Sequence, residues 1–221
     1  EGIPATGYSL CYELGIFRQK IVDGKQTEVA DDWRSAAESW LVARNDEAVE
    51  VRFGGTISPR WDSFGRYHAE HTGYQTVTAV PRDMLIAGYG GNEVNILRLW
   101  DARSTSALDM YLFSEGEYVK SLEQRTMSEV ITKVLYPADD HIEGKTLRLK
   151  QQYFFLSATA QSIIKTHIKR FGDIKSFSKH HRIQINDTHP ALVIPELMRI
   201  MMDEYGLGWD EAWDQVSQSV A

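Results

Sequence analysis

Cysteine is nearly absent from this chain of 221 residues, which contains Cys11 alone. A single thiol excludes a framework of internal disulfides and is typical of proteins from a reducing compartment. We therefore expect a cytoplasmic protein. Because Cys11 follows Leu10 in a strand-like stretch, we interpret it as a small buried apolar side chain and not as a nucleophile.

Long apolar runs, a secretion signal and an excess of basic residues are missing as well. No run is long enough to span a bilayer, so we expect no membrane partner. The net charge is −7 and no basic stripe is visible, which argues against a nucleic-acid partner. A glycine-rich phosphate loop, a Gly-x-Ser-x-Gly turn and a His-Glu-x-x-His helix are also absent. What remains is an ordinary globular composition, 43% hydrophobic and 25% charged.

The first half of the chain has the alternating pattern of strands. Asp23-Gly24 predicts a hairpin turn, and Pro81-Arg82-Asp83 predicts a turn between two strands. We interpret residues 58–73, which are polar and aromatic, as a surface excursion. The short connections favour antiparallel pairing. The predicted strands are 8–12, 16–22, 49–53, 76–80, 84–88, 93–100 and 181–185.

The second half changes to a helical period. We expect a weakly amphipathic helix over 115–134 and a long helix over 146–170 that Gly172 ends. Asp210 is predicted to cap a last helix whose inner stripe is Ala212, Trp213 and Val216. The fold class is α/β. We predict a single partial domain over 1–221, strand-rich over 1–110 and helix-rich over 111–221.

A polar turn at residues 186–190 joins the predicted strand 181–185 to a predicted helix over 191–200. Ligands of open α/β sheets bind where strands end and helices begin, so Asp187, Thr188 and His189 are candidates for a binding site. An equally simple explanation is that Asp187 or Thr188 caps the helix. The residues by themselves leave both explanations open.

A second polar loop covers residues 136–143. Its Asp139 and His141 would form a metal site together with Asp187 and His189, as in a metal-dependent hydrolase. The spacing matches no fixed metal-binding pattern, so this hypothesis is the weaker one.

Several strings of the chain resemble the α-glucan phosphorylases, the family of glycogen, starch and maltodextrin phosphorylases. They keep the order and spacing of that family over nearly the whole chain, and residues 55–75 fit least well. The strings are Gly7-Tyr8, Tyr12-Glu13, Gly15-Ile16-Phe17, Ala30-Asp31-Asp32-Trp33, Arg98-Leu99-Trp100, Val134-Leu135-Tyr136-Pro137, Glu143-Gly144-Lys145, Leu147-Arg148-Leu149-Lys150-Gln151, Asn186-Asp187-Thr188-His189-Pro190 and Ile194-Pro195-Glu196-Leu197-Met198-Arg199.

The resemblance implies an internal segment of the N-terminal, Rossmann-like domain of a two-domain (GT-B type) glycosyltransferase fold. The full enzyme would convert an α-1,4-glucan and phosphate to glucose 1-phosphate and a shortened glucan. It would use pyridoxal 5′-phosphate, whose lysine lies outside this chain, and form a homodimer through the helix 115–134. Neither end of the chain resembles a natural terminus, so we expect a fragment that is inactive alone. The alternative is a non-catalytic carbohydrate-binding or dimerisation module on the same fold.

The resemblance also implies roles for residues near position 140. Tyr136, Asp139, Asp140 and His141 match the gate loop over the catalytic cleft, and Arg148 matches a cleft arginine. The gate usually carries Asn at positions 138 and 140. We expect the negative charge of Asp140 to disfavour phosphate close by.

Two further sets of positions follow from the resemblance. Asp187 and His189 match residues that bind the glucan or line the pocket beside the reacting sugar. Arg98 and Lys165 are remnants of a nucleotide effector site, whose paired arginines are replaced by Lys165 and Thr166. Because the fork-shaped donors that capture phosphate are missing, we expect no activation by AMP.

Overall fold

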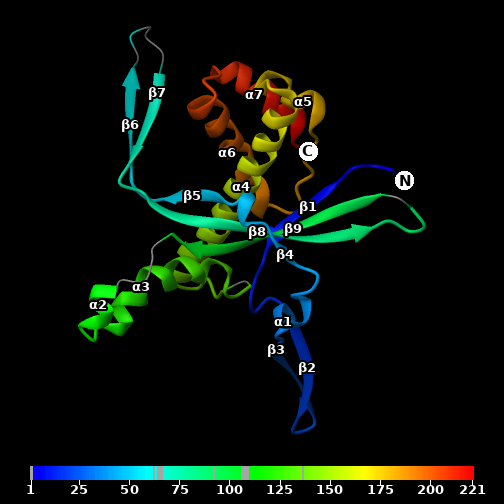
Figure 1. Cartoon of the computed structure of the whole chain (residues 1–221), viewed down its shortest axis with the longest axis vertical. Helices are drawn as coiled ribbons and strands as arrows, with labels where there is room; N and C mark the ends of the chain where they lie inside the picture. The colour runs from blue at the N-terminus through cyan, green and yellow to red at the C-terminus, as the bar shows by residue number, and fades with distance from the viewer. Residues whose placement is uncertain (1, 62, 64–66, 92, 106–109, 136) are drawn as a thin grey trace. The chain divides into compact units, whose positions relative to one another are not determined.

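The computed structural model describes residues 2–61, 63, 67–91, 93–105, 110–135 and 137–221 (Figure 1). The chain combines helices and strands, which confirms the α/β class. It divides into two compact units: Glu1–Glu50 with Val77–Gln151, and Val51–Thr76 with Gln152–Ala221. We call them unit 1 and unit 2.

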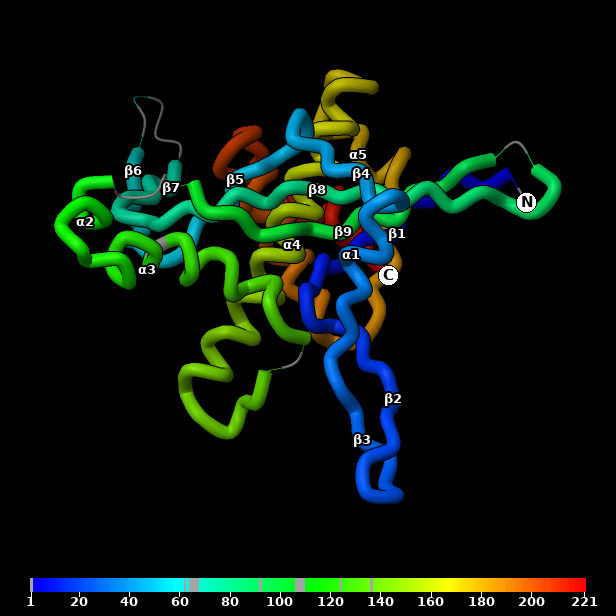
Figure 2. The backbone as a smooth tube through the Cα atoms, turned by 60° about the horizontal axis from the view of Figure 1, so that its bottom comes forward, coloured from blue at the N-terminus to red at the C-terminus, as the bar shows by residue number. Residues whose placement is uncertain are grey.

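A mixed sheet organises unit 1. The strand order is β1-β9-β8-β4, and β5 also pairs with β8. The pair β8–β9 is antiparallel, as its short connection predicts. The pair β4–β8 is antiparallel as well, whereas β1–β9 is parallel. The long strands β8 and β9 run side by side (Figure 2). The strands are β1 (Thr6–Leu10), β4 (Val42–Ala43), β5 (Val49–Phe53), β8 (Gln75–Ala87) and β9 (Val94–Ser104).

The predicted turn at residues 81–83 is wrong, because β8 continues through Pro81. Pro81 lies opposite Trp100 of β9, and its carbonyl accepts a hydrogen bond from the N–H of Arg44 at 2.8 Å. The N–H and C=O of one strand residue point to the same neighbour. The missing N–H of Pro81 therefore faces the β4 side, where the ladder is only two residues long and little pairing is lost.

Two hairpins lie outside this sheet. In unit 1, Asp23 and Gly24 have φ of 51° and 74°, which confirms the predicted turn of a type I′ hairpin. In unit 2, a second hairpin occupies most of the stretch 58–73. Its strand β6 is exposed along its whole length, which agrees with the predicted surface excursion. The hairpins are β2 (Phe17–Val22) with β3 (Lys25–Ala30), and β6 (Thr56–Trp61) with β7 (Tyr67–Thr72).

The helices of unit 1 differ from the prediction mainly at their ends. The predicted helix 115–134 is shorter, because Gly116, with φ of 82°, separates α2 from α3. The long helix α4 crosses from unit 1 into unit 2 and starts earlier than predicted, but it ends before Gly172 (φ 75°) as expected. The helical segments are α1 (Trp33–Ala37), η1 (Asn45–Glu47), α2 (Met110–Ser114), α3 (Tyr118–Glu129), η2 (Val130–Thr132) and α4 (Ile142–Phe171).

The core of unit 1 lies between the sheet and α1. Cys11, Leu41 and Leu99 are buried there and pack against Trp33 and Met84. Cys11 has no exposed surface, and its burial raises the pKa of the thiol. Its interpretation as a buried apolar side chain is thus confirmed.

Unit 2 is mainly helical. Hydrogen bonds tie α4 to α6 through Ser157 and Glu196, which are 2.7 Å apart, and Phe154, Phe177, Leu197 and Val216 are fully buried. The segments after α4 are η3 (Ile174–Ser176), α5 (Phe177–His180), η4 (His189–Leu192), α6 (Val193–Arg199), the π-helix η5 (Ile200–Glu204) and α7 (Trp209–Ser219).

Two local predictions in unit 2 are wrong at α7. The residue before the helix is Gly208, and not Asp210, and its N–H donates to the Glu211 carboxylate at 3.3 Å. Of the predicted inner stripe, Ala212 and Val216 are buried, but Trp213 is 49% exposed.

The predicted strand 181–185 is a single bridge. Ile183 pairs in parallel with Val220, and its N–H donates to the Ser219 carbonyl at 2.7 Å. The side chains still alternate between the two faces as predicted, since Ile183 and Ile185 are half-buried while Arg182 and Gln184 are exposed. Among the described residues, none of the helices is both long and apolar enough to cross a membrane.

Candidate functional site

The turn before η4 holds Asp187 in an unusual backbone conformation. Its φ is 70°, in the left-handed region that aspartate tolerates better than most residues. The Oδ1 atom accepts hydrogen bonds from the N–H and the hydroxyl of Thr188, at 2.5 and 3.1 Å. These bonds lower the pKa of the Asp187 carboxyl, and the nearby His189 adds to the effect. The turn therefore presents a stable carboxylate on the surface.

The capping explanation accounts for little of this geometry. Thr188 is the residue before η4, but its side chain makes no capping hydrogen bond. Asp187 accepts hydrogen bonds from Thr188, the residue next to it, whereas the N–H of Ala191 in η4 donates to the Thr188 carbonyl.

His189 lies beside this carboxylate. Its Nε2 is 3.9 Å from Oδ2 of Asp187, and its Nδ1 is 3.4 Å from Nε2 of Gln152 on α4. Because an amide NH₂ only donates, Nδ1 is assigned as the acceptor and Nε2 carries the proton. The pair thus offers a carboxylate acceptor and an imidazole N–H donor, which are the groups needed to bind neighbouring hydroxyls.

In unit 1, the start of α4 is surrounded by the predicted gate residues. Arg148 forms a close ion pair with Asp139. His141 accepts a hydrogen bond at Nδ1 from the N–H of Gly144 at 2.9 Å. Asp140 is exposed, and Tyr136 lies outside the described residues.

Arg98 is buried in unit 1 and is bound by two carboxylates. It is 7% exposed, and its Nε and Nη2 donate to Asp83 at 2.8 and 2.7 Å. Nη2 also lies 2.6 Å from Glu47. Burial acts to lower the pKa of the guanidinium, but the bonds to Asp83 and Glu47 outweigh it and raise the pKa. Lys165, the other effector-site candidate, is exposed on the unit 2 part of α4.

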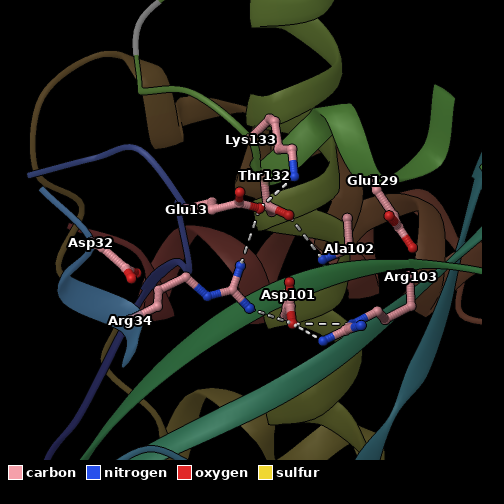
Figure 3. A pocket seen from close by; sticks show the side chains of 9 residues that line it. All are labelled: Glu13, Asp32, Arg34, Asp101, Ala102, Arg103, Glu129, Thr132 and Lys133. Atoms are coloured by element: carbon pink, nitrogen blue, oxygen red, sulfur yellow. Dashed lines mark hydrogen bonds and ion pairs between the residues drawn. The ribbon is translucent and has the colours of Figure 1, made fainter. Parts of the chain in front are cut away.

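A charged pocket of about 290 Å³ in unit 1 has no counterpart in the sequence predictions (Figure 3). The buried carboxylate of Asp101 is its centre. The Oδ2 atom accepts from Arg34 at 3.1 Å, Arg82 at 3.0 Å and Arg103 at 2.8 Å. The lining residues are Glu13, Asp32, Arg34, Asp101, Ala102, Arg103, Glu129, Thr132 and Lys133. Because the lining carries both signs in nearly equal number, the pocket does not select strongly for an anion or a cation.

An apolar pocket of about 380 Å³ lies in unit 2. The exposed indoles of Trp209 and Trp213 form part of its wall. Its other lining residues are Ala69, Ile194, Pro195, Met198, Arg199, Met202 and Asp203. None of the predicted site residues that the structure describes lines either pocket.

The metal hypothesis receives no support from the part of the chain that the structure describes. There, no group of three or more His, Cys, Asp or Glu side chains is arranged to hold a metal ion.

The family model of carbohydrate phosphorylases matches residues 1–221, the whole chain. The chain belongs to the carbohydrate phosphorylase family. The resemblance found in the sequence is thereby confirmed.

Relatives of this phosphorylase chain come from distant organisms. A glycogen phosphorylase of Synechocystis is 41% identical over 211 residues, which cover 96% of this chain and 25% of that protein. A glycogen phosphorylase of Saccharomyces cerevisiae is 42% identical over 222 residues, which cover 100% of this chain and 25% of that protein. The brain form of Homo sapiens is 40% identical over 228 residues, which cover 100% of this chain and 26% of that protein. The chain therefore spans about a quarter of the length of these relatives.

Sequence reasoning gave no role to three residues of this phosphorylase chain whose contacts the structure shows. Gln152 contacts His189 from 37 positions away, Gly144 lies against the loop before α4, and Asp101 collects three arginines. Only Gly144 belongs to a string that carries the family resemblance.

Proposed function

We propose that this chain is part of an α-1,4-glucan phosphorylase, which converts glucan and phosphate to glucose 1-phosphate and a shortened glucan. The observation that carries the proposal is the family match over every residue, together with relatives named glycogen phosphorylase. The chain then belongs to the N-terminal, Rossmann-like domain of a GT-B type enzyme and is inactive alone. Its single buried thiol, Cys11, supports a cytoplasmic location.

In this function, Asp187 and His189 bind and orient the sugar. The ionised carboxylate accepts hydrogen bonds from sugar hydroxyls, and the Nε2–H of His189 donates to a hydroxyl oxygen. Fixed donors and acceptors hold the sugar in one orientation, which lowers the entropic barrier to glucosyl transfer.

Asp139, Asp140, His141, Tyr136 and Arg148 form the gate in the same proposal. The ion pair of Asp139 with Arg148 neutralises one acid of the loop. Asp140 keeps its charge at the surface, so it disfavours phosphate close to the loop.

The cofactor of the proposed enzyme is pyridoxal 5′-phosphate, but the residues of this chain do not fit it. The aldehyde of this cofactor forms a Schiff base with a lysine that is usually desolvated in a pocket. In the described part of the chain, no lysine is buried. The Schiff-base lysine of the proposal therefore lies in another part of the enzyme.

The proposed homodimer forms through α3. Tyr118, Val119, Leu122 and Met127 expose large apolar surfaces on this helix, with Val119 84% exposed. A second copy would remove that surface from water, which favours association.

The proposed enzyme is not activated by AMP. A phosphate group is bound best by an arginine whose fork of donors is available. In unit 1, the Nε and Nη2 of Arg98 already bond to Asp83, and Nη2 also pairs with Glu47, so the fork is not available to a phosphate.

The decisive assay is phosphate-dependent release of glucose 1-phosphate from maltoheptaose with pyridoxal 5′-phosphate added. We expect release by the full-length enzyme that contains this chain and none by the chain alone. Release by the isolated chain would show that a complete site lies within it and would refute its role as a part. Absence of release by the full-length enzyme would refute the function itself.

A further inference from the structure

Gly144, in the first turn of α4, lies where no side chain fits. Its backbone is helical and the residue is buried, so space and not dihedral angle is the constraint. A Cβ atom at this position would collide with the carbonyl oxygen of Ala138 and lie 2.9 Å from its carbon. The same atom would be 2.8 Å from Cε1 of His141. The glycine therefore permits the loop to lie directly against the helix.

His141 fastens the end of this loop. Its carbonyl accepts the N–H of Lys145 at 3.1 Å, and its Nδ1 accepts the N–H of Gly144 at 2.9 Å. The residue thus occupies the N-cap position, and its imidazole satisfies one of the N–H groups that a helix start leaves without a partner. Histidine performs here the task of the usual Asn, Asp, Ser or Thr.

Arg148 holds the middle of the loop through its ion pair with Asp139. The segment 137–141 is therefore attached to α4 by a backbone contact, a cap and an ion pair, all supplied by residues 141–148. A side chain at Gly144 would displace Ala138 and His141 together, and Asp139 lies between them in sequence.

We propose that Gly144 and His141 are positioning residues, which hold Asp139 in place for the reaction through the contact with Ala138 and the cap of α4. The proposal rests on the proposed phosphorylase function, because it assigns Asp139 to the substrate gate.

The first test measures amide hydrogen exchange of the full-length enzyme with Gly144→Ala. We expect faster exchange in residues 139–148 and unchanged exchange in β8 and β9. Gly88→Ala is the matched control, because among the described residues a Cβ there meets only the carbonyl oxygen of Glu93, at 3.5 Å. Unchanged exchange near the loop in a folded variant would overturn the positioning role. This measurement is independent of catalysis, so it separates failure of the inference from failure of the proposed function.

The second test uses the full-length enzyme. A misplacement of the loop is expected to lower kcat/KM about tenfold in Gly144→Ala, whereas Gly88→Ala changes it less than about twofold. His141→Ala should weaken the same parameter, and His141→Asn should restore most of it, because asparagine is a good N-cap. If Gly144→Ala does not fold, the comparison of His141→Ala with His141→Asn still tests the positioning role. Local loosening without a change in kcat/KM, or no rescue by asparagine, would overturn the proposal.

Discussion

The loop 137–141 of unit 1 and the turn 186–190 of unit 2 each present a carboxylate. The groups that bind the two carboxylates differ in charge. Asp139 of unit 1 is paired with a guanidinium, that of Arg148. Asp187 of unit 2 is held by an N–H and a hydroxyl of Thr188, beside the imidazole of His189. The first carboxylate has its charge cancelled, whereas the second keeps it.

This difference decides what each carboxylate can do for a ligand. Neutral donors stabilise the charge of Asp187 without removing it, so in the proposed function sugar hydroxyls would meet a full negative charge. Asp139 acts together with its arginine, and its position depends on the loop 137–141. The two segments should consequently respond differently to substitution, to acid and to a phosphate-bearing effector.

The largest effect is expected from removing the charge of Asp187. Charge-assisted hydrogen bonds to a substrate are strong, so Asp187→Asn in the full-length enzyme should lower kcat/KM by about 100-fold. Asp23→Asn is the matched control, since Asp23 is also an exposed aspartate with positive φ (51°). Steady-state assays with maltoheptaose and phosphate measure both variants. A loss below about threefold in Asp187→Asn would contradict the role of its charge.

Acid should destabilise unit 2. His181, which begins the segment leading to Asp187, has its pKa lowered from 6.5 to about 4 by burial and by His167, His180 and Arg170. Its Nε2 lies 3.0 Å from Nδ1 of His167, and Nε2 of His167 lies 2.8 Å from the Asp173 carbonyl oxygen.

The sign of this effect follows from the lowered pKa. The unfolded chain takes up a proton near pH 6.5 and the folded chain only near pH 4, so stability falls as the pH drops through this window. We expect the free energy of unfolding to fall by about 2 kcal/mol. This figure already allows for the partial exposure of the ring, which weakens the effect. Urea unfolding at several pH values measures it. An equal pH dependence in His181→Phe would contradict the assignment to His181.

A smaller effect is expected from breaking the ion pair of unit 1. Arg148→Gln leaves Asp139 without its guanidinium, and we expect kcat/KM of the full-length enzyme to fall about tenfold. Lys175→Gln, which breaks an exposed ion pair with Glu211, is the control and should change kcat/KM less than about twofold. Equal effects of the two substitutions would show that the Asp139–Arg148 pair has no special role.

The smallest effect is expected from AMP. In unit 1, the positive charge of Arg98 is balanced by two carboxylates, those of Asp83 and Glu47. A titration with AMP should change the rate of the full-length enzyme less than about twofold. Clear activation would show that Arg98 is not bound in this way in the working enzyme, or that another site binds the nucleotide.

Sequence reasoning was most successful where the neighbouring residues decide the conformation. The turn at Asp23-Gly24 and the helix end at Gly172 both depend on positive φ, which glycine adopts without strain. The continuation of β8 through Pro81 was missed because proline normally interrupts strands. Proline normally costs a strand one hydrogen bond, but β4 pairs with β8 over only two residues, so little is lost here. No local sequence pattern reveals the length of the neighbouring strand pairing.

The candidate site was predictable in part. The polar turn containing Asp187 and His189 is visible as a cluster in the sequence, but its partner Gln152 on α4 is not. The site roles of these residues remain predictions.

The sequence by itself determined the family, the α/β class and the tight turn at Asp23-Gly24, because these depend on ordered strings and on the backbone preferences of single residues. Only the tertiary structure decided which charges meet. Arg34, Arg82 and Arg103 come from separate strands and a helix and converge on Asp101, and Gly144 lies against Ala138. Such contacts depend on how whole elements pack, and the free energy that selects the packing is shared among residues far apart in the chain.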